Sequence, residues 1–401
     1  MHNLKIWNYL SIPWLVFTFT FFIIFFLLAF LVEIDSSYLS KNYLNKLFLN
    51  TVILSFGSAI LSAIIAVPLA ILVTFYKFPG HRFFSWSLSL SIAFPAYVYA
   101  FIYVGIFEYA SPISEYLRNF NITLPQIKNI YGASVIMSMA LFPYIFLLTK
   151  AHLRSVGIKS FKAAKSLGNN NITAIRKVII PSLWPTIIAG MALVVFETIA
   201  DFGGVSTLRI ETFTVGIYDA WFGYQSYFSA TRLAGYLLIF VFLIMFLAKY
   251  FGEKSSNLAS KTAETFQRIE TSPMVGLGVL LFCSFVFIIV FCLPTTQLII
   301  WNLSDSSSNI LSNLQLLINS SIVGLLASVI TVFFAIALAL SYKHSNILKS
   351  PILISSSGYA IPGSVISAGL LVGVDYIFDT SITFYGILGL IVCLSLRFMT
   401  P

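Results

Sequence analysis

The stretch Lys162–Pro181 reads KAAKSLGNNNITAIRKVIIP and is the most basic interruption of an otherwise apolar chain. An apolar run stands directly before it and another directly after it. With its flanks it carries no Asp or Glu, and its basic residues are Lys150, Arg154, Lys159, Lys162, Lys165, Arg176 and Lys177. Such a stretch could bind nucleic acid in a soluble protein, but between two apolar runs it is predicted to be a loop at a membrane surface.

The composition places the whole chain in a membrane. Hydrophobic residues make up 59% of it and charged residues 9%, whereas an ordinary soluble domain has about 45–50% and about 25%. The formal net charge is +9, and the basic residues are confined to particular loops. This distribution indicates how the chain is oriented in the membrane, and no nucleic-acid partner is predicted. The cysteines, Cys283, Cys292 and Cys393, all lie inside apolar runs and are expected to be small buried hydrophobic residues.

Ten apolar runs are long enough to cross a bilayer. They lie at about 12–33, 50–75, 84–107, 131–152, 178–200, 231–251, 274–295, 319–341, 351–374 and 382–400. The sequence therefore predicts an all-α polytopic membrane protein with about ten transmembrane helices. With the N-terminus in the cytoplasm, most basic residues fall on the inner side and most acidic residues on the outer side, which favours that orientation in a bacterial inner membrane.

The chain also repeats itself. The matched elements, in order along each half, are Asn50-Thr51 with Asn319-Ser320, Tyr76-Lys77 with Tyr342-Lys343, Pro95 with Pro362, Val104-Gly105 with Val372-Gly373, and Tyr131-Gly132 with Tyr385-Gly386. Two parallel repeats are therefore predicted, with a first transmembrane half at 1–251, a cytoplasmic linker at 252–273 and a second transmembrane half at 274–401. The equivalent of the basic loop would fall beyond Pro401, so the chain is expected to be truncated before it.

The basic loop resembles a known family signature. Ala163, Ala164, Gly168, Val178, Ile180 and Pro181 have the spacing of the EAA loop of permease subunits of bacterial ATP-binding-cassette (ABC) importers. The resemblance implies a type I ABC importer permease fold and an ATPase-docking loop at 162–181. Gly168 would end a short helix in the left-handed conformation, and Asn169 to Asn171 would supply turn and N-cap chemistry. Lys162 stands where the family has an acidic residue.

A narrower resemblance covers nearly the whole chain. The runs FETIADFG at Phe196–Gly203 and TFTVGIYDAW at Thr212–Trp221 resemble permeases of ferric-iron importers that carry both transmembrane halves in one polypeptide. The resemblance implies a solute-binding protein that delivers Fe(III), two copies of a separate ATPase, and no catalysis by this subunit. Related permeases serve thiamine, phosphonate, sulfate and polyamines, so these substrates stay open. The outer segment Arg209–Tyr224 is the candidate for receiving the binding protein, or else an ordered outer loop.

Other classes of function are disfavoured by what the chain lacks. No GxxxxGK[ST] motif occurs, so ATP is expected to be used by a partner subunit and no cofactor to be bound by this chain. An ion-coupled secondary transporter would need coupling charges within its spans, and such charges are almost absent. A membrane-embedded enzyme would need a His or carboxylate cluster at membrane depth. The sequence has no such cluster, so the chain is predicted not to be an enzyme.

Candidates for the translocation path come from two acids near the outer end of one span. Glu197 and Asp201 are four residues apart and so share one helix face. Acids at such places are costly unless they line a path, and hard Fe(III) suits oxygen ligands. The alternative is that Asp201 caps or pairs locally at the helix end and that Glu197 contacts a binding protein.

Aromatic and proline residues extend the list of candidates. Tyr97, Tyr99 and Tyr103 follow Pro95 in the outer half of a span. They are interpreted as interfacial belt residues in preference to a path lining, with Tyr97 kept as a path candidate. Pro95 and Pro362 hold equivalent places in the repeat and are expected to break their helices, which would leave carbonyls free toward a cavity.

Overall fold

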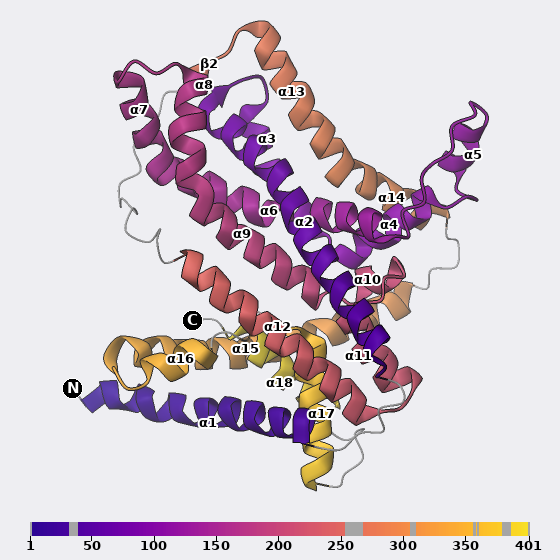
Figure 1. Cartoon of the computed structure of the whole chain (residues 1–401), viewed down its shortest axis with the longest axis vertical. Coiled ribbons are helices and arrows are strands. Elements are labelled where there is room, and N and C mark those ends of the chain that lie inside the picture. Colours follow the sequence, from indigo (N-terminus) through magenta and orange to yellow (C-terminus); the bar gives the residue numbers. More distant parts are fainter. Residues whose placement is uncertain are drawn as a thin grey trace. The chain divides into compact units, whose positions relative to one another are not determined.

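The computed structural model describes residues 2–31, 39–252, 268–304, 310–355, 358, 361–378 and 386–399. The chain forms two compact units, each drawn from separate stretches of sequence (Figure 1). The first unit contains Met1–Phe48, Thr212–Phe242 and Asp305–Pro401, and the second contains Leu49–Glu211 and Leu243–Ser304. Helices α2 (Lys41–Phe75) and α12 (Tyr227–Gly252) each contribute residues to both.

The second unit holds most of the predicted site residues. Its further elements are β1 (Tyr76–Lys77), α3 (His81–Ser87), a 3-10 turn η1 (Leu90–Ala93), α4 (Ala96–Phe107), α5 (Pro112–Arg118), α6 (Ile130–His152), a π-helical turn η2 (Leu153–Gly157), α7 (Ile158–Ser166), α8 (Asn171–Ala174), a π-helical turn η3 (Ile175–Ile179), α9 (Ile180–Ala200), α10 (Gly203–Thr207), β2 (Ile269–Glu270), α13 (Pro273–Phe287), a π-helical turn η6 (Ile288–Cys292) and α14 (Leu293–Ser304). Helix α6 packs against α9 and α4, and α4 packs against α10.

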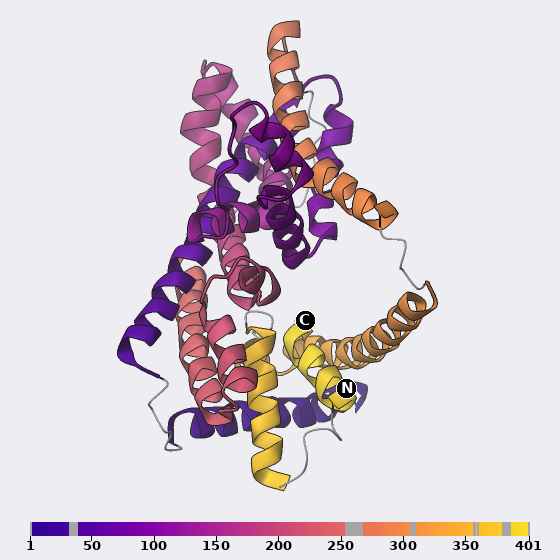
Figure 2. The same ribbon diagram turned by 90° about the vertical axis from the view of Figure 1, so that its right-hand side faces the viewer.

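The first unit is built on α1 (His2–Leu31). Its other elements are α11 (Phe213–Tyr218), a π-helical turn η4 (Asp219–Gly223), α15 (Ile310–His344), α16 (Lys349–Ser355), α17 (Gly363–Phe378) and α18 (Gly386–Phe398). Figures 1 and 2 show α17 crossing α1, and the side chain of Phe25 lies against Gly369 at this crossing. Buried hydroxyls add polar contacts, since Ser341 lies 3.1 Å from Ser11. Small residues and hydroxyls are what allow helices to associate in lipid.

The all-α polytopic class is confirmed, but the number of spans is not. Within the described ranges, seven helices are long and apolar enough to cross a membrane, or eight if the bent pair His81–Ala93 and Ala96–Arg118 counts as one. The predicted count of about ten stays a prediction, because two of the predicted runs extend beyond the described residues. Within the described part of the run 351–374 lie α16 and the first part of α17, which starts just after Pro362, and within the described part of the run 382–400 lies the 13-residue α18.

One small parallel sheet ties the second unit together across the sequence. Tyr76 pairs with Ile269 and Lys77 with Glu270. The Lys77 ammonium lies 3.1 Å from the Glu270 carboxylate, and the Thr271 hydroxyl donates to the Lys77 carbonyl at 2.9 Å. The sheet fixes the described end of the predicted linker 252–273. Residues 253–267 and 379–385 lie outside the described residues, so the division into two halves at this linker and the parallel repeat stay predictions.

Candidate functional site

The basic loop begins with a helix that ends as the sequence predicts. Helix α7 stops at Ser166, and Gly168 has a φ of +85°. The Asn169 amide donates to the Ala164 carbonyl at 3.2 Å, and the Gly168 amide donates to the Lys165 carbonyl at 3.0 Å. This pair of hydrogen bonds is a Schellman motif, which satisfies the last carbonyls of a helix and requires the left-handed conformation that glycine adopts without strain.

The next helix begins with an asparagine cap. The Asn170 side chain accepts a hydrogen bond from the Thr173 amide at 2.7 Å at the start of α8. From there α8, η3 and α9 form one apolar helix over Asn171–Ala200. The turn and N-cap chemistry predicted for Asn169 to Asn171 is therefore confirmed. At about 1.5 Å per residue this helix is on the order of 45 Å long, so it connects the loop to the other end of a membrane span.

Exposure shows which part of the loop a partner could reach. Lys162 and Ala163 are exposed, whereas Ala164 is buried with Phe161, whose ring centroid lies 5.0 Å from that of Phe75. Ala164 thus allows α7 to approach its own unit, and only Ala163 of the pair is open to an external surface. Of the remaining predicted loop residues, Gly168 and Pro181 are exposed, and Val178 and Ile180 are half-buried.

Sequence reasoning missed two apolar residues of this loop. Leu167 is 82% exposed and Ile172 is 75% exposed, on either side of the Gly168 turn. Their signal in the sequence is the presence of large aliphatic residues in an otherwise polar turn. Exposed apolar side chains that flank a polar loop are typical of an interaction surface.

The two predicted path acids lie at the far end of the same helix. Glu197 is half-buried in the last turn of α9, and Asp201 follows the helix directly. The Asp201 carboxylate accepts a hydrogen bond from the Gly204 amide at 3.0 Å, in the first turn of α10. The local contact expected of a helix-end residue is thus present. Within the described residues no three His, Cys, Asp or Glu side chains gather closely enough to hold a metal ion.

Glycines bring the start of α4 close to these acids. A Cβ on Gly203 would lie 2.9 Å from the Cβ of Tyr97, and one on Gly204 would lie 3.4 Å from the Ala96 carbonyl oxygen. The approach of Tyr97 requires glycine at position 203, and at position 204 a Cβ would collide with the Asp201 carboxylate. The structure therefore gathers Tyr97 and Asp201 at one place, with Pro95 next to it in the chain.

The proline prediction is confirmed for the first member of the pair. Pro95 precedes α4, and the helical segments before and after it are bent by 89°. A proline here removes a backbone donor and ends the preceding helix. Pro362 stands at the start of α17 in the first unit. A role of either proline in exposing carbonyls to a path stays a prediction.

Two tyrosines differ from their predicted place. Tyr99 is fully buried and Tyr103 is 5% exposed, so neither is a belt residue at the membrane surface. Their hydroxyls donate to carbonyls of η6, Tyr103 to Ile289 at 2.7 Å and Tyr99 to Val290. A π-helical turn displaces carbonyls from regular helical bonding, and buried carbonyls need donors. Tyr97, by contrast, is 52% exposed.

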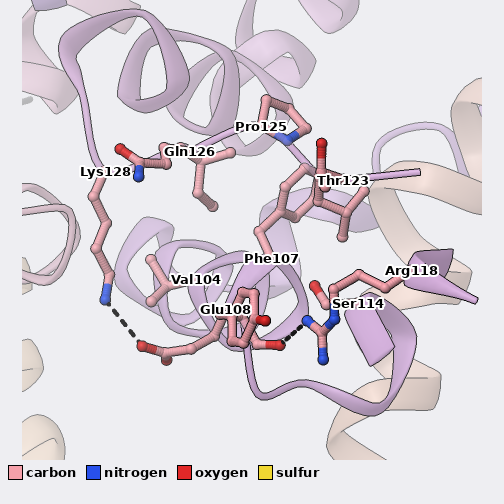
Figure 3. Close-up of a pocket in the computed structure, with 12 residues that line it drawn as sticks. Val104, Phe107, Glu108, Ser114, Arg118, Thr123, Pro125, Gln126 and Lys128 are labelled. Carbon is pink, nitrogen blue, oxygen red and sulfur yellow. Dashed lines mark hydrogen bonds and ion pairs between the residues drawn. The ribbon is translucent and has the colours of Figure 1, made fainter. Parts of the chain in front are cut away.

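A cavity of about 430 Å³ lies on the side predicted to be outer (Figure 3). It is lined by the end of α4, by α5 and by the loop that leads to α6. Lys128 lies 3.4 Å from Glu108, and the Arg118 guanidinium carbon stands 4.0 Å from the ring centroid of Tyr109 while donating to the Tyr109 carbonyl. This cavity was not predicted from the sequence, because its charges, Glu108, Arg118 and Lys128, come from the end of α4, from α5 and from the loop that leads to α6.

The helices, their apolar length and the loop define a polytopic membrane protein with an exposed basic helix–turn–helix. Residues 66–257 match the family described as the inner membrane component of binding-protein-dependent transport systems. The match covers just under half of the chain, which is therefore similar over this region to permease components of such transport systems.

Three relatives show the extent of the similarity. The Fe(3+)-transport system permease protein FbpB 2 of Haemophilus influenzae is 25% identical over 80% of this chain and 62% of its own length. The sulfate transport system permease protein CysT of Salmonella typhimurium is 26% identical over 39% of this chain and 55% of its own. A permease protein of the same organism named for 2-aminoethylphosphonate transport, PhnU, is 24% identical over 38% and 57%. The chain thus spans between half and two thirds of the length of these relatives.

Proposed function

We propose that this chain is the transmembrane permease subunit of a binding-protein-dependent ABC importer, and that it moves ferric iron across a bacterial inner membrane by alternating access. The observation that carries the proposal is the Gly168 turn between α7 and the helix Asn171–Ala200, inside the region that matches the permease family. Two copies of a separate ATPase would use the ATP, and a solute-binding protein would deliver the substrate. The N-terminus would lie in the cytoplasm.

The coupling step follows from the helix that starts at the loop. Nucleotide-driven closure of the ATPase would move α7 and the turn, and a rigid helix transmits such a motion along its length. The far end of this helix carries Glu197 and leads into Asp201, which lies beside the start of α4. A displacement at the loop would therefore shift the two acids relative to Tyr97. This is a direct mechanical connection from the docking loop to the proposed path.

Iron is supported by two features of different kinds. The relative that is similar over the greatest share of the chain, among the three named above, is a ferric-iron permease. Oxygen ligands, which hard cations prefer, are available on Asp201 and Tyr97, which the neighbouring glycines Gly204 and Gly203 contact, and on Glu197 in the last turn of α9. Sulfate is the second candidate because CysT is similar over the permease region, and phosphonate, thiamine or polyamines are further members of the same class.

The proposed docking of the ATPase on the loop 162–181 is tested by replacing Gly168 with valine. A valine at φ +85° is strained, whereas nothing lies within 4 Å to obstruct its side chain, so the change acts on the backbone of the turn. We expect Gly168→Val to abolish ATP-dependent uptake into proteoliposomes that contain the partner ATPase and binding protein. The matched control is Gly278→Val, which also has open space around it but sits in the α13 helix without a positive φ. Normal coupled uptake by Gly168→Val would refute the docking role.

The substrate is tested separately from the docking. In the same proteoliposomes, uptake of radioactive iron should be reduced by unlabelled Fe(III) and left unchanged by an excess of sulfate or 2-aminoethylphosphonate. If labelled sulfate were accumulated and iron were not, the class of permease would stand and the iron assignment would be wrong.

A further inference from the structure

Four cationic side chains gather where the second unit carries the start of the basic loop. Arg82 lies on α3, Lys150 is near the end of α6, and Arg154 lies in η2. The Lys150 ammonium donates to the carbonyl of Ser85, and the Arg154 guanidinium donates to the Ser85 hydroxyl at 3.2 Å. Because Lys150 and Arg154 are four residues apart, one helix face presents both to α3.

The fourth cation comes from a distant part of the sequence. Arg268 directly precedes β2, whose pairing of Ile269 with Tyr76 fixes its position. Burial, and after it the positive charges of Arg154 and Arg82, lower the pKa of the Arg268 guanidinium. Its Nε is buried and has no hydrogen-bond partner. Three guanidinium groups are therefore held near one another at a cost in electrostatic free energy.

Their counter-charge is not supplied by the part of the chain that the structure describes. The ion pairs found there join Lys77 to Glu270 and Lys128 to Glu108, and neither includes any of the four cations. Guanidinium groups bind phosphate oxygens through paired hydrogen bonds, and a buried unpaired donor is costly. An anion with several oxygens would reduce the repulsion between these cations and would accept a hydrogen bond from the unpaired Nε of Arg268.

The surroundings of the cluster indicate what carries this anion. On the same short helix as Arg82, Phe83 is 42% exposed and Trp86 is 55% exposed. On α13, Leu277 is 53% exposed and Leu281 is 60% exposed. Aromatic residues at the end of a span and aliphatic residues along it are typical of a surface in contact with lipid. A free phosphate ion would gain nothing from these apolar neighbours.

We propose that Arg82, Lys150, Arg154 and Arg268 bind the phosphate of an anionic phospholipid, with its acyl chains against α3 and α13. The strand pair β1–β2 completes this site, because it holds the segment of Arg268 beside Tyr76 and Lys77, which shortly precede Arg82 in the chain. The proposal does not depend on which solute the permease carries.

Native mass spectrometry of the full chain in detergent tests the site. The lipids are dioleoyl phosphatidylglycerol and, as a zwitterion of equal chain length, dioleoyl phosphatidylcholine. We expect the wild type to retain phosphatidylglycerol in preference to phosphatidylcholine. Arg154→Gln and Arg268→Gln should each weaken its retention roughly fivefold, since one basic residue near anionic lipid contributes about that much. The matched control Lys177→Gln removes an exposed positive charge from the basic loop and should leave retention unchanged.

The outcomes separate the sources of the anion. Equal retention of the two lipids, or unchanged retention by both arginine variants, would overturn the proposal. Displacement of phosphatidylglycerol by millimolar inorganic phosphate would assign the site to a free anion and would equally overturn it. If Arg268→Gln does not fold, Arg82→Gln decides, because Arg82 is exposed. In that case brominated phosphatidylglycerol should quench Trp86 fluorescence in the wild type, measured against Trp86→Phe, and quench it less in Arg82→Gln.

Discussion

Asp201 offers a clean separation between a structural and a transport role. Its carboxylate accepts a hydrogen bond from the Gly204 amide at 3.0 Å. Asp201→Asn keeps an acceptor oxygen and removes the charge, whereas Asp201→Ala removes both. Loss of such a side-chain cap costs about 1 kcal/mol. For a unit the size of the second one, this corresponds to a decrease in Tm of about 2–4 °C.

The negative charge of Asp201 would stabilise a cation in the path by more free energy than the cap contributes to folding. A unit charge about 4 Å from a carboxylate is stabilised by about 4 kcal/mol at an effective dielectric constant of about 20. A tenfold loss of uptake requires only about 1.4 kcal/mol, so it is a modest expectation for Asp201→Asn. We therefore predict that Asp201→Asn takes up iron at least tenfold more slowly with an unchanged Tm, and that Asp201→Ala loses both uptake and stability.

The assay combines thermal unfolding in detergent with iron uptake into proteoliposomes. Ser111→Ala is the control, because the Ser111 hydroxyl accepts from the Ser114 amide at 3.1 Å and caps α5 in the same unit. It should lower the Tm by a similar amount and leave uptake per folded molecule unchanged. Wild-type uptake by Asp201→Asn, with Asp201→Ala destabilised, would reduce Asp201 to a cap and remove it from the path.

Two further predictions concern packing and hydrogen bonding. Gly369→Ala would place a Cβ against the ring edge of the buried Phe25 and should destabilise the first unit by about 1–3 kcal/mol. The control Gly324→Ala, with nothing within 4 Å, should leave the Tm unchanged, and equal Tm values for the two variants would contradict the close packing. Tyr103→Phe leaves the buried Ile289 carbonyl without its donor and should lower the free energy of unfolding by about 1–3 kcal/mol, measured by denaturant unfolding. The control Tyr97→Phe, on an exposed tyrosine, should cause no measurable change. An unchanged free energy of unfolding for Tyr103→Phe would show that its hydroxyl is dispensable.

Local chemistry was predictable from the sequence, and long-range partners were not. The Gly168 turn and the Asn170 cap depend on residues within five positions, and both are present as predicted. The burial of Tyr103 depends on a carbonyl 186 residues away, in a π-helical turn that no periodicity announces. In the same way, the segment of Arg268 reaches the segment before α3 through the pairing of two very short strands. Hydropathy located the helices, and the break at Pro95 bends one predicted span by 89°.

Because Lys162 begins the proposed docking loop with a positive charge, binding of a partner would depend on the exposed apolar residues Leu167 and Ile172. Lys162 is exposed and carries the charge opposite to that of the family's acid, so it would repel a basic partner surface. An exposed ion pair contributes at most about 1 kcal/mol, and its loss is correspondingly small. Burying a large aliphatic side chain contributes about 1.5–3 kcal/mol, and Leu167 and Ile172 are both available on this loop. Docking through these two side chains would therefore outweigh the reversed charge, which makes the proposed coupling compatible with lysine at position 162.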